Sequence, residues 1–225
     1  MNEFVTYESE NCRFHFFPNS LAEVEIKNII KVQESSRKKI LDFFGIKNNR
    51  KIDYFLYPTN QVKGEMMGDD GNGNADPKKF EVHAVYNEDV KCIGPHEDTH
   101  LLVTFLGLPP QLFREGLAEY MSETWHNKNH AEWARQFLSE GKLPDLEQII
   151  DDEKWYEYDD LIAYPSAGSF VIFLITKLGR EKFLELYKIL NRDFTPEKNK
   201  VFFKEVTGSS ISDLQKEWEN GLGRL

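Results

Sequence analysis

The chain has 225 residues, of which 40% are hydrophobic and 29% charged, the balance of a soluble globular protein with a substantial core. Its formal net charge of −10 argues against nucleic acid, or an anionic membrane surface, as the main partner. Cys12 and Cys92 form no CxxC motif, and we expect two free buried thiols, with a single disulfide as the alternative.

The first residues carry neither a basic start nor an apolar run, so no signal peptide is expected. The apolar run FVIFLI, at 170–175, is too short to cross a bilayer. We therefore expect a cytoplasmic protein without a membrane span. A leader removed before this sequence begins would make it a secreted protein instead.

The first 92 residues mix strands with one long amphipathic helix. Apolar residues recur at three-to-four spacing over 20–44, where Ser20 is a candidate N-cap and Gly45 a candidate stop. Alternating residues predict strands, and Gly, Asn and Asp predict a loop. The expected elements are a strand at 12–19, a helix at 20–44, a strand at 51–58, a surface loop at 68–79 and a strand at 80–87.

From residue 93 onward the pattern becomes helical. Helices are expected at 95–106, 111–125, 130–139, 145–150, 160–178, 180–190, 198–206 and 211–222. Strands with one helix, followed by an all-helical half, indicate the α+β class. We predict one domain over 1–225, with a strand-rich subdomain at 1–92 and a helical subdomain at 93–225.

The sequence HEDTH, from His96 to His100, has the spacing of a metal site. Four residues along a helix bring His96 and His100 onto one face, where both imidazoles can reach one ion. Glu97 then lies beside the ion, placed to take a proton from the attacking water. Pro95 suits the first turn of this helix, and Gly107 is expected to follow its end.

A hydrolytic zinc site needs a third protein ligand, and the next predicted helix offers two. Glu115 and Glu119, in the segment EGLAEY, lie four residues apart on one helix face. Gly116 between them is costly within a helix, and close approach of the metal helix would explain it. A solvated pair of surface glutamates is the alternative interpretation.

HExxH followed by an EGLAEY helix resembles the gluzincin metallopeptidases, the peptidase MA-like group related to aminopeptidase N and thermolysin. The resemblance implies a thermolysin-like catalytic domain, with a zinc site between a small mixed sheet and a helical half. It implies that Glu115 joins His96 and His100 as the third zinc ligand, with Glu97 as general base. Glu119 would be a supporting carboxylate. It remains a rival for the third ligand, because the spacing from the histidines to the ligand is longer in aminopeptidase N and Glu119 fits that spacing by count.

In aminopeptidase N relatives, a tyrosine near a small-residue stretch donates a hydrogen bond to the oxyanion. Tyr164, before Ser166, Ala167 and Gly168, matches that position, while Tyr156 and Tyr158 compete with it and simple core packing is the alternative. The motif that binds a free substrate amino terminus in aminopeptidase N is missing. An endopeptidase therefore fits better, with the strand at 80–87 bordering the cleft and pairing with extended substrate.

Other polar patterns receive no role. His83 is expected to be packed or exposed, and His126 and His130, in HNKNH, to be solvated. An EF-hand-like spacing of Asp70, Asn72, Asn74 and Glu81 lacks the glycine that a calcium loop needs, so a mobile loop is preferred there.

The sequence thus predicts a zinc-dependent metallopeptidase that hydrolyses peptide bonds with a metal-activated water and acts on a peptide or protein substrate. A non-catalytic zinc-stabilised peptide-binding scaffold, and an enzyme acting on an ester or epoxide, are the alternatives. The set of two histidines and a glutamate favours Zn²⁺ over Mn²⁺, Co²⁺ or Fe²⁺.

Overall fold

A computed structural model describes residues 4–223 and divides the chain into two compact units. Unit 1 extends to Thr104, and unit 2 begins at Phe105. The division falls later than the subdomain boundary expected at residue 92, so the helix that carries HEDTH belongs to the strand-rich unit.

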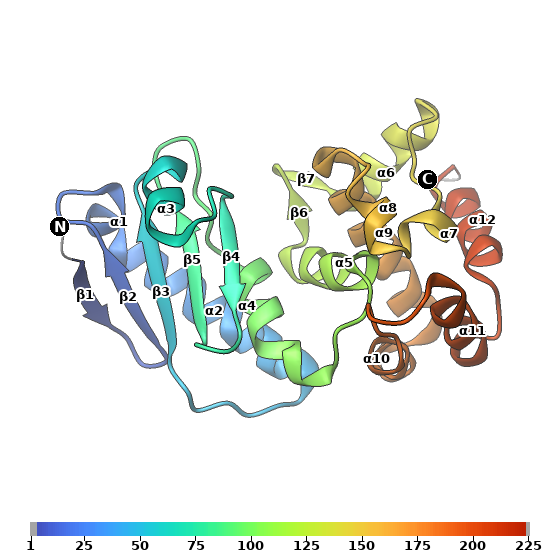
Figure 1. Cartoon of the computed structure of the whole chain (residues 1–225), viewed down its shortest axis with the longest axis horizontal. Coiled ribbons are helices and arrows are strands. Elements are labelled where there is room, and N and C mark those ends of the chain that lie inside the picture. The colour runs from blue at the N-terminus through green and yellow to red at the C-terminus, as the bar shows by residue number, and fades with distance from the viewer. Residues whose placement is uncertain (1–3, 224–225) are drawn as a thin grey trace. The chain divides into compact units, whose positions relative to one another are not determined.

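Unit 1 contains a five-stranded mixed sheet with the order β1-β2-β3-β5-β4 (Figure 1). The three inner strands run parallel, and both edge strands are antiparallel to their neighbours. The strands are β1 (Val5–Glu8), β2 (Cys12–Phe16), β3 (Ile52–Tyr57), β4 (Gly73–Asp76) and β5 (Glu81–Val85).

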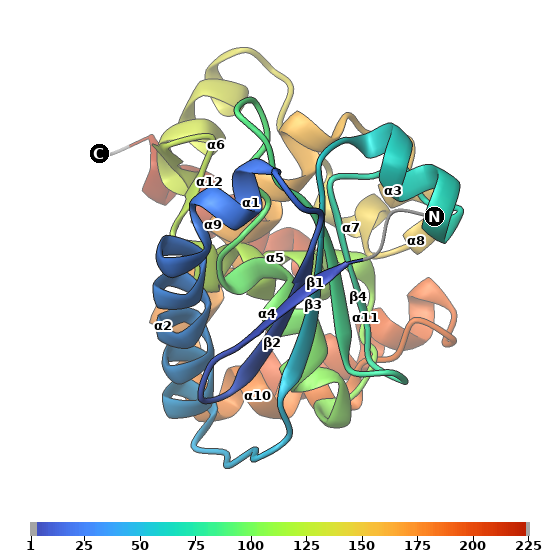
Figure 2. The same cartoon turned by 90° about the vertical axis from the view of Figure 1, so that its left-hand side faces the viewer.

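Four helices complete unit 1: α1 (Leu21–Val24), α2 (Ile26–Phe44), α3 (Asn60–Met67) and α4 (Pro95–Val103). Ser20 caps α1 by accepting a hydrogen bond from the Glu23 N–H, and Gly45 ends α2 in the left-handed conformation, both as predicted. Figure 2 shows α2 on one side of the sheet and α3 on the other. The structure differs from the expected helix at 20–44 by a break at Glu25.

The strand at one edge of the sheet is β4, and not the strand at 80–87 that we expected to border the cleft. Residues 73–76, inside the expected loop at 68–79, form β4, which pairs with β5. The predicted strand at 80–87 is confirmed as β5, but both of its edges pair with other strands, β3 and β4, so it has no free edge with which to pair with a substrate. Residues rich in Gly, Asn and Asp have low strand propensity, so pairing with a neighbour decides the conformation here.

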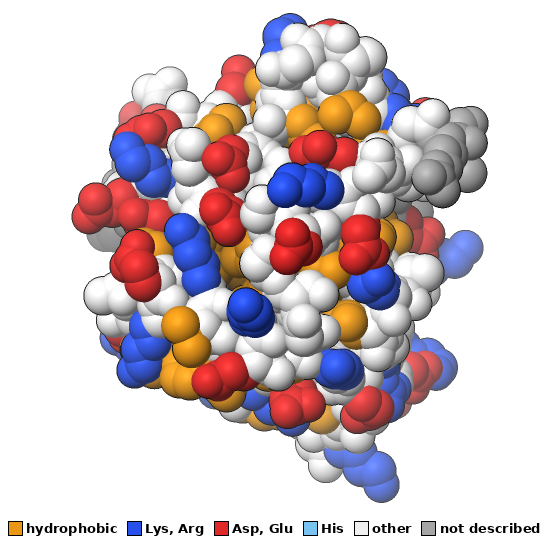
Figure 3. Space-filling model, turned by 90° about the vertical axis from the view of Figure 1, so that its right-hand side faces the viewer, with side chains coloured by type: hydrophobic (Ala, Val, Ile, Leu, Met, Phe, Trp, Pro, Cys, Tyr) orange, Lys and Arg blue, Asp and Glu red, His pale blue; other side chains and the backbone are white. Residues whose placement is uncertain are grey.

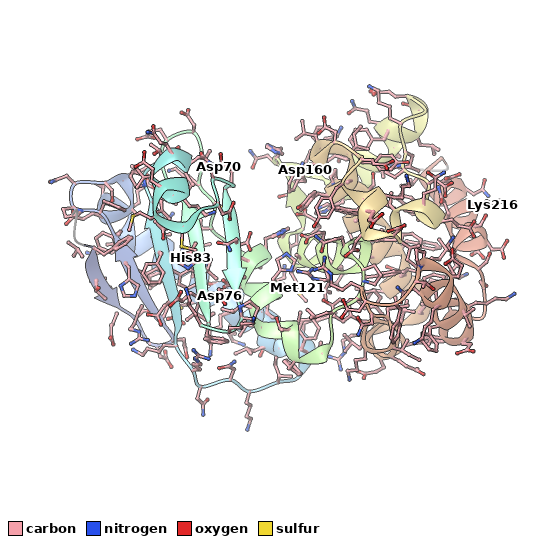
Figure 4. The ribbon with its side chains drawn as sticks, in the orientation of Figure 1. Asp70, Asp76, His83, Met121, Asp160 and Lys216 are labelled. Carbon is pink, nitrogen blue, oxygen red and sulfur yellow. The ribbon has the colours of Figure 1, made fainter. Side chains whose placement is uncertain are left out.

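The two faces of the sheet have different contents. On one face Phe14 stacks on Tyr54, and both are fully buried. On the opposite face the Phe55 ring stacks between those of His15 and His83. His83 is labelled on β5 in Figure 4; it is packed, as one of the two expectations held, and its Nδ1 lies 2.9 Å from the Tyr57 hydroxyl.

Unit 2 is almost entirely helical, with one two-stranded hairpin. All eight predicted helices of the chain after residue 93 are found, with ends shifted by a few residues and with an additional short helix, α8. The elements are α5 (Gln111–Ser122), β6 (Thr124–Trp125), β7 (Lys128–Asn129), α6 (His130–Ser139), α7 (Leu146–Ile149), α8 (Asp152–Trp155), α9 (Asp160–Leu178), α10 (Arg180–Ile189), α11 (Pro196–Thr207) and α12 (Ile211–Leu222).

Helix α9 forms the core of unit 2 and packs mainly on α5 and α6. Gly116 of α5 is the point of close approach: an added Cβ would lie 2.7 Å from the Ala167 carbonyl oxygen and 2.5 Å from Val171 Cγ2. We expected the metal helix to approach Gly116, and that prediction was wrong, because the neighbour is α9. The glycine is needed because two helix backbones meet there.

Helix α9 is also long and apolar enough to cross a membrane, by length and composition. The apolar run at 170–175, which we judged too short for this, is only part of that helix. Half of its most apolar window is buried within the protein, as in the core helix of a globular unit. The expected lack of a membrane span stays a prediction.

The α+β class and the small mixed sheet with one long helix are confirmed. Both cysteines are free thiols, and Cys12 is fully buried while Cys92 is half-buried. Acidic and basic side chains are interspersed over the face shown in Figure 3, so the net charge does not gather into one acidic surface there.

Candidate metal centre

Helix α4 begins at Gly94 and Pro95, and its first turn is fixed from α2. Gly94 adopts a positive φ of 120°. Pro95 opens the helix, and this placement of the proline was predicted. The Gln33 side chain receives the Gly94 N–H at 2.6 Å and donates to the Asp98 carboxylate at 3.2 Å. One buried amide thus holds both the start and the inner face of the helix.

His96 and His100 lie one turn apart on the half-buried face of α4. Their Nε2 atoms are 3.2 Å apart, and the rings meet edge to face with centroids 4.9 Å apart. Two nitrogens bound tetrahedrally to one zinc ion lie about 3.3 Å from each other, given Zn–N bonds of about 2.0–2.1 Å. The separation therefore suits shared coordination of one ion.

Glu97 is half-buried and lies beside the edge strand β4. A Cβ at Gly73 would lie 2.7 Å from Glu97 Oε1 and 2.6 Å from Cys92 Sγ, so only glycine fits where the strand passes these groups. Burial, and then the nearby Glu97 carboxylate, raises the pKa of the Cys92 thiol to about 12. The thiol is therefore protonated at neutral pH.

The inner face of α4 is anchored by Asp98, which is fully buried. Tyr54 of β3 donates a hydrogen bond to Asp98 Oδ1, which also receives the Gln33 amide. Burial raises the pKa of Asp98 to about 7, while the hydrogen bond from Tyr54 acts against that rise. Leu101 and Leu102 are buried as expected, but Phe105 is 64% exposed and Leu106 half-buried, because the helix becomes a 3-10 turn at Thr104.

The two glutamates of α5 are both buried, which contradicts the alternative of solvated surface charges. Glu119 is 1% exposed, and its Oε2 lies 2.6 Å from Nε2 of His130. His130 is fully buried, so the prediction that it is solvated was wrong.

The described residues contain one group of His, Cys, Asp and Glu side chains that can hold a metal ion: His96, His100 and Glu115. Their candidate ligand atoms all lie within 4.8 Å of one another. Two imidazole nitrogens and one carboxylate oxygen are the donor set of many catalytic zinc sites, so these residues fit Zn²⁺. Glu119 is not part of this group.

Tyr164 lies in the first turns of α9, between two tryptophans. Its ring stacks on Trp125 of the β6–β7 hairpin with centroids 5.2 Å apart, and meets Trp155 edge to face at 5.5 Å. Of its two rivals, Tyr156 is 66% exposed and its hydroxyl accepts a hydrogen bond from Gln111, while Tyr158 is half-buried. Two tryptophan rings thus contact Tyr164, whereas most of Tyr156 is exposed.

Gln33, Tyr54 and His130 were missed by sequence reasoning. Gln33 and Tyr54 lie on the predicted helix and strand, but their partners are 61 and 44 residues away, a pairing that one sequence does not reveal. For His130 a local signal of the helix start existed, since Asn129 before it is an N-cap residue whose side chain accepts the Ala131 N–H, but that signal does not report the burial of the histidine.

No family model matches the chain, and no curated protein matches it either.

Proposed function

We propose that the protein is a zinc-dependent metallopeptidase, with a thermolysin-like arrangement of its sheet and metal helix. The observation that supports it best is the pair His96 and His100, whose Nε2 atoms at 3.2 Å match two vertices of a zinc tetrahedron. Glu115, in the same potential metal group, is the proposed third ligand. When bound, Zn²⁺ would supply Lewis acidity toward the scissile carbonyl and make a water molecule more acidic.

Glu97 is the proposed general base. It follows the first ligand directly, so its side chain leaves α4 about 100° around the helix from that of His96 and about 60° from that of His100. It takes a proton from the attacking water and delivers it to the leaving amine. Gly73, which has no side chain, leaves room for this carboxylate beside β4.

Tyr164 is the proposed hydrogen-bond donor to the charge that develops on the attacked carbonyl oxygen. The stacking on Trp125 supports this role, because an oxyanion donor acts best when its orientation is set before the reaction. Packing on the hydrophobic core remains the competing explanation for the ring.

The edge strand β4 supports a preference for extended peptides. Its inner edge pairs with β5, and it passes directly beside Glu97. A substrate that added itself to the outer edge of β4 would align its backbone by main-chain hydrogen bonds, whatever its side chains. This mode of binding suits an endopeptidase acting on a peptide or protein.

The substitution Glu97→Gln tests this function. The variant should retain about one zinc per chain, since the ligands are intact, and lose hydrolysis of unstructured peptides by about 10²–10⁴-fold. Full activity in Glu97→Gln would contradict the mechanism. A wild-type protein that binds zinc and peptides yet cuts none would be the scaffold, whereas turnover of esters or epoxides alone would indicate the third alternative.

A further inference from the structure

A buried hydrogen bond on α5 joins Glu119 to the first residue of α6, His130. The Nε2 and Oε2 atoms are 2.6 Å apart, and the two side chains are 0% and 1% exposed. Removing two polar or charged side chains from water costs folding free energy, which their mutual hydrogen bond offsets only in part. A functional role for this pair would explain that cost.

The hydrogen bond has a defined direction. His130 Nδ1 has no hydrogen-bond partner among the described residues, so a proton on that nitrogen would be buried without an acceptor. The tautomer with its proton on Nε2 satisfies the pair, with His130 donating and the Glu119 carboxylate accepting. Oε2 of Glu119 therefore accepts the hydrogen bond from the imidazole.

The pair is also fixed by packing. An added Cβ at Gly168 of α9 would lie 2.6 Å from His130 Cδ2 and 2.7 Å from Glu119 Cβ. The Asn129 cap and the β6–β7 hairpin set the position of His130 at the start of α6. A side chain at position 168 would therefore press on both residues, and glycine lets α9 pass close beside the pair.

We propose that His130 is a positioning residue of the metal centre, which acts through Glu119. It holds the Glu119 carboxylate in one orientation, one helical turn from Glu115, so that Glu119 supports the site as a hydrogen-bond acceptor and Glu115 remains the ligand. This inference rests on the proposed zinc site, but it does not need the protein to be a peptidase. Partners of metal ligands commonly change metal affinity by about 10–100-fold when they are replaced.

The test compares three substitutions of His130 by zinc affinity, measured on the purified 225-residue chain in competition with a chromophoric chelator. His130→Gln keeps an N–H donor near the position of Nε2, whereas His130→Asn is too short and His130→Leu has no donor. We expect Gln to bind zinc within about threefold of wild type, and Asn and Leu to lose about 10–100-fold. The Gln and Asn pair keeps the test valid if the Leu variant does not fold.

A second measurement asks whether His130 acts through Glu119. In a Glu119→Gln background, adding His130→Asn should weaken zinc binding little further, because the two positions form one unit. Asn199→Ala is the matched control, since it also removes a buried hydrogen-bonded side chain of unit 2, on α11. It should lower the urea midpoint without changing zinc affinity.

The outcomes separate this inference from the proposed function. Equal zinc affinity in wild type, His130→Asn and Asn199→Ala would overturn the role of His130 and leave the peptidase proposal standing. The expected loss of affinity in a protein that cleaves no peptide would support His130 and reject the peptidase. A wild type that binds no zinc at all would overturn both.

Discussion

Gln33 and Gly94, 61 residues apart in sequence, are joined through a single side chain: Oε1 of Gln33 accepts the Gly94 N–H at 2.6 Å. The amide nitrogen of the same side chain donates to Asp98. The start of the proposed metal helix is therefore set by the long helix of the sheet unit rather than by its own cap, since Gly94 offers no capping side chain.

Gln33→Leu should destabilise unit 1 by about 1–3 kcal/mol, because the Gly94 N–H and the Asp98 carboxylate both lose a partner in a buried setting. Urea unfolding measures this change. Gln61→Leu is the control: Gln61 is exposed on α3 and bonds only to Glu65 among the described contacts, so its loss should matter by less than about 0.5 kcal/mol. Similar losses in the two variants would show that Gln33 has no special role.

Metal content distinguishes the two candidate glutamates. Zinc measured by mass spectrometry should be about one per chain in wild type, lost in Glu115→Ala, and retained in Glu119→Ala when zinc is in excess. Glu119→Ala should show only a weaker affinity, because it removes support and not a ligand. If Glu119→Ala alone abolishes zinc binding, the site is correct in kind and the third ligand is Glu119.

Gly116→Ala should destabilise unit 2, although alanine is the better helix former. The added Cβ would press on the Ala167 carbonyl oxygen and on Val171 Cγ2, and overpacking of this kind costs about 1–3 kcal/mol. Gly221→Ala provides the control, because Gly221 also lies within a helix and nothing surrounds its Cβ position within 4 Å. That variant should gain up to about 1 kcal/mol, and thermal unfolding of both checks the contrast.

The two contacts that Asp53 makes, with Arg13 and with His15, predict a pH dependence. Burial raises the pKa of Asp53, but hydrogen bonds from His15 and Arg13 outweigh it and leave the pKa below its ordinary value. A depressed carboxyl pKa stabilises the fold above the unfolded value of about 3.9, and this contribution disappears as the pH falls through the folded pKa.

Asp53→Asn should accordingly be less stable than wild type at pH 7, by an amount of the order of 1 kcal/mol for a partly exposed ion pair. The difference should begin to shrink as the pH falls below about 4, where the unfolded chain takes up the Asp53 proton, and it should disappear once the pH has fallen through the lower pKa of the folded state. Unfolding free energies of both proteins between pH 3 and pH 7 give the result. A constant difference over that range would mean that the Asp53 charge does not stabilise the fold.

Local signals in the sequence were sufficient for most helices. Ser20, Gly45 and Pro95 act at the ends where their chemistry placed them, because capping depends only on neighbouring residues. Strand β4 was not readable, since Gly73–Asp76 has the composition of a loop and becomes a strand only by pairing with β5.

The features of the candidate site also fall into two groups: those that local sequence predicts and those that depend on distant residues. The spacing of His96 and His100 follows from helix geometry alone, and the structure places their nitrogens 3.2 Å apart. The burial of His130 depends on Gly168, 38 residues further along the chain, and no local pattern reports such a fit. Gly116 was correctly singled out as a close approach, but the sequence could not say which helix approaches it.

The two thiols have a practical consequence. Cys12 and Cys92 are the only cysteines of the chain, both lie before Thr104, and burial raises the pKa of each to about 12. Alkylating reagents react with thiolates, so labelling of the folded protein should be slow and should wait for local opening. The labelling rate of the native chain, followed by intact mass, therefore reports the opening of the sheet unit alone and gives no signal for opening of the helical unit.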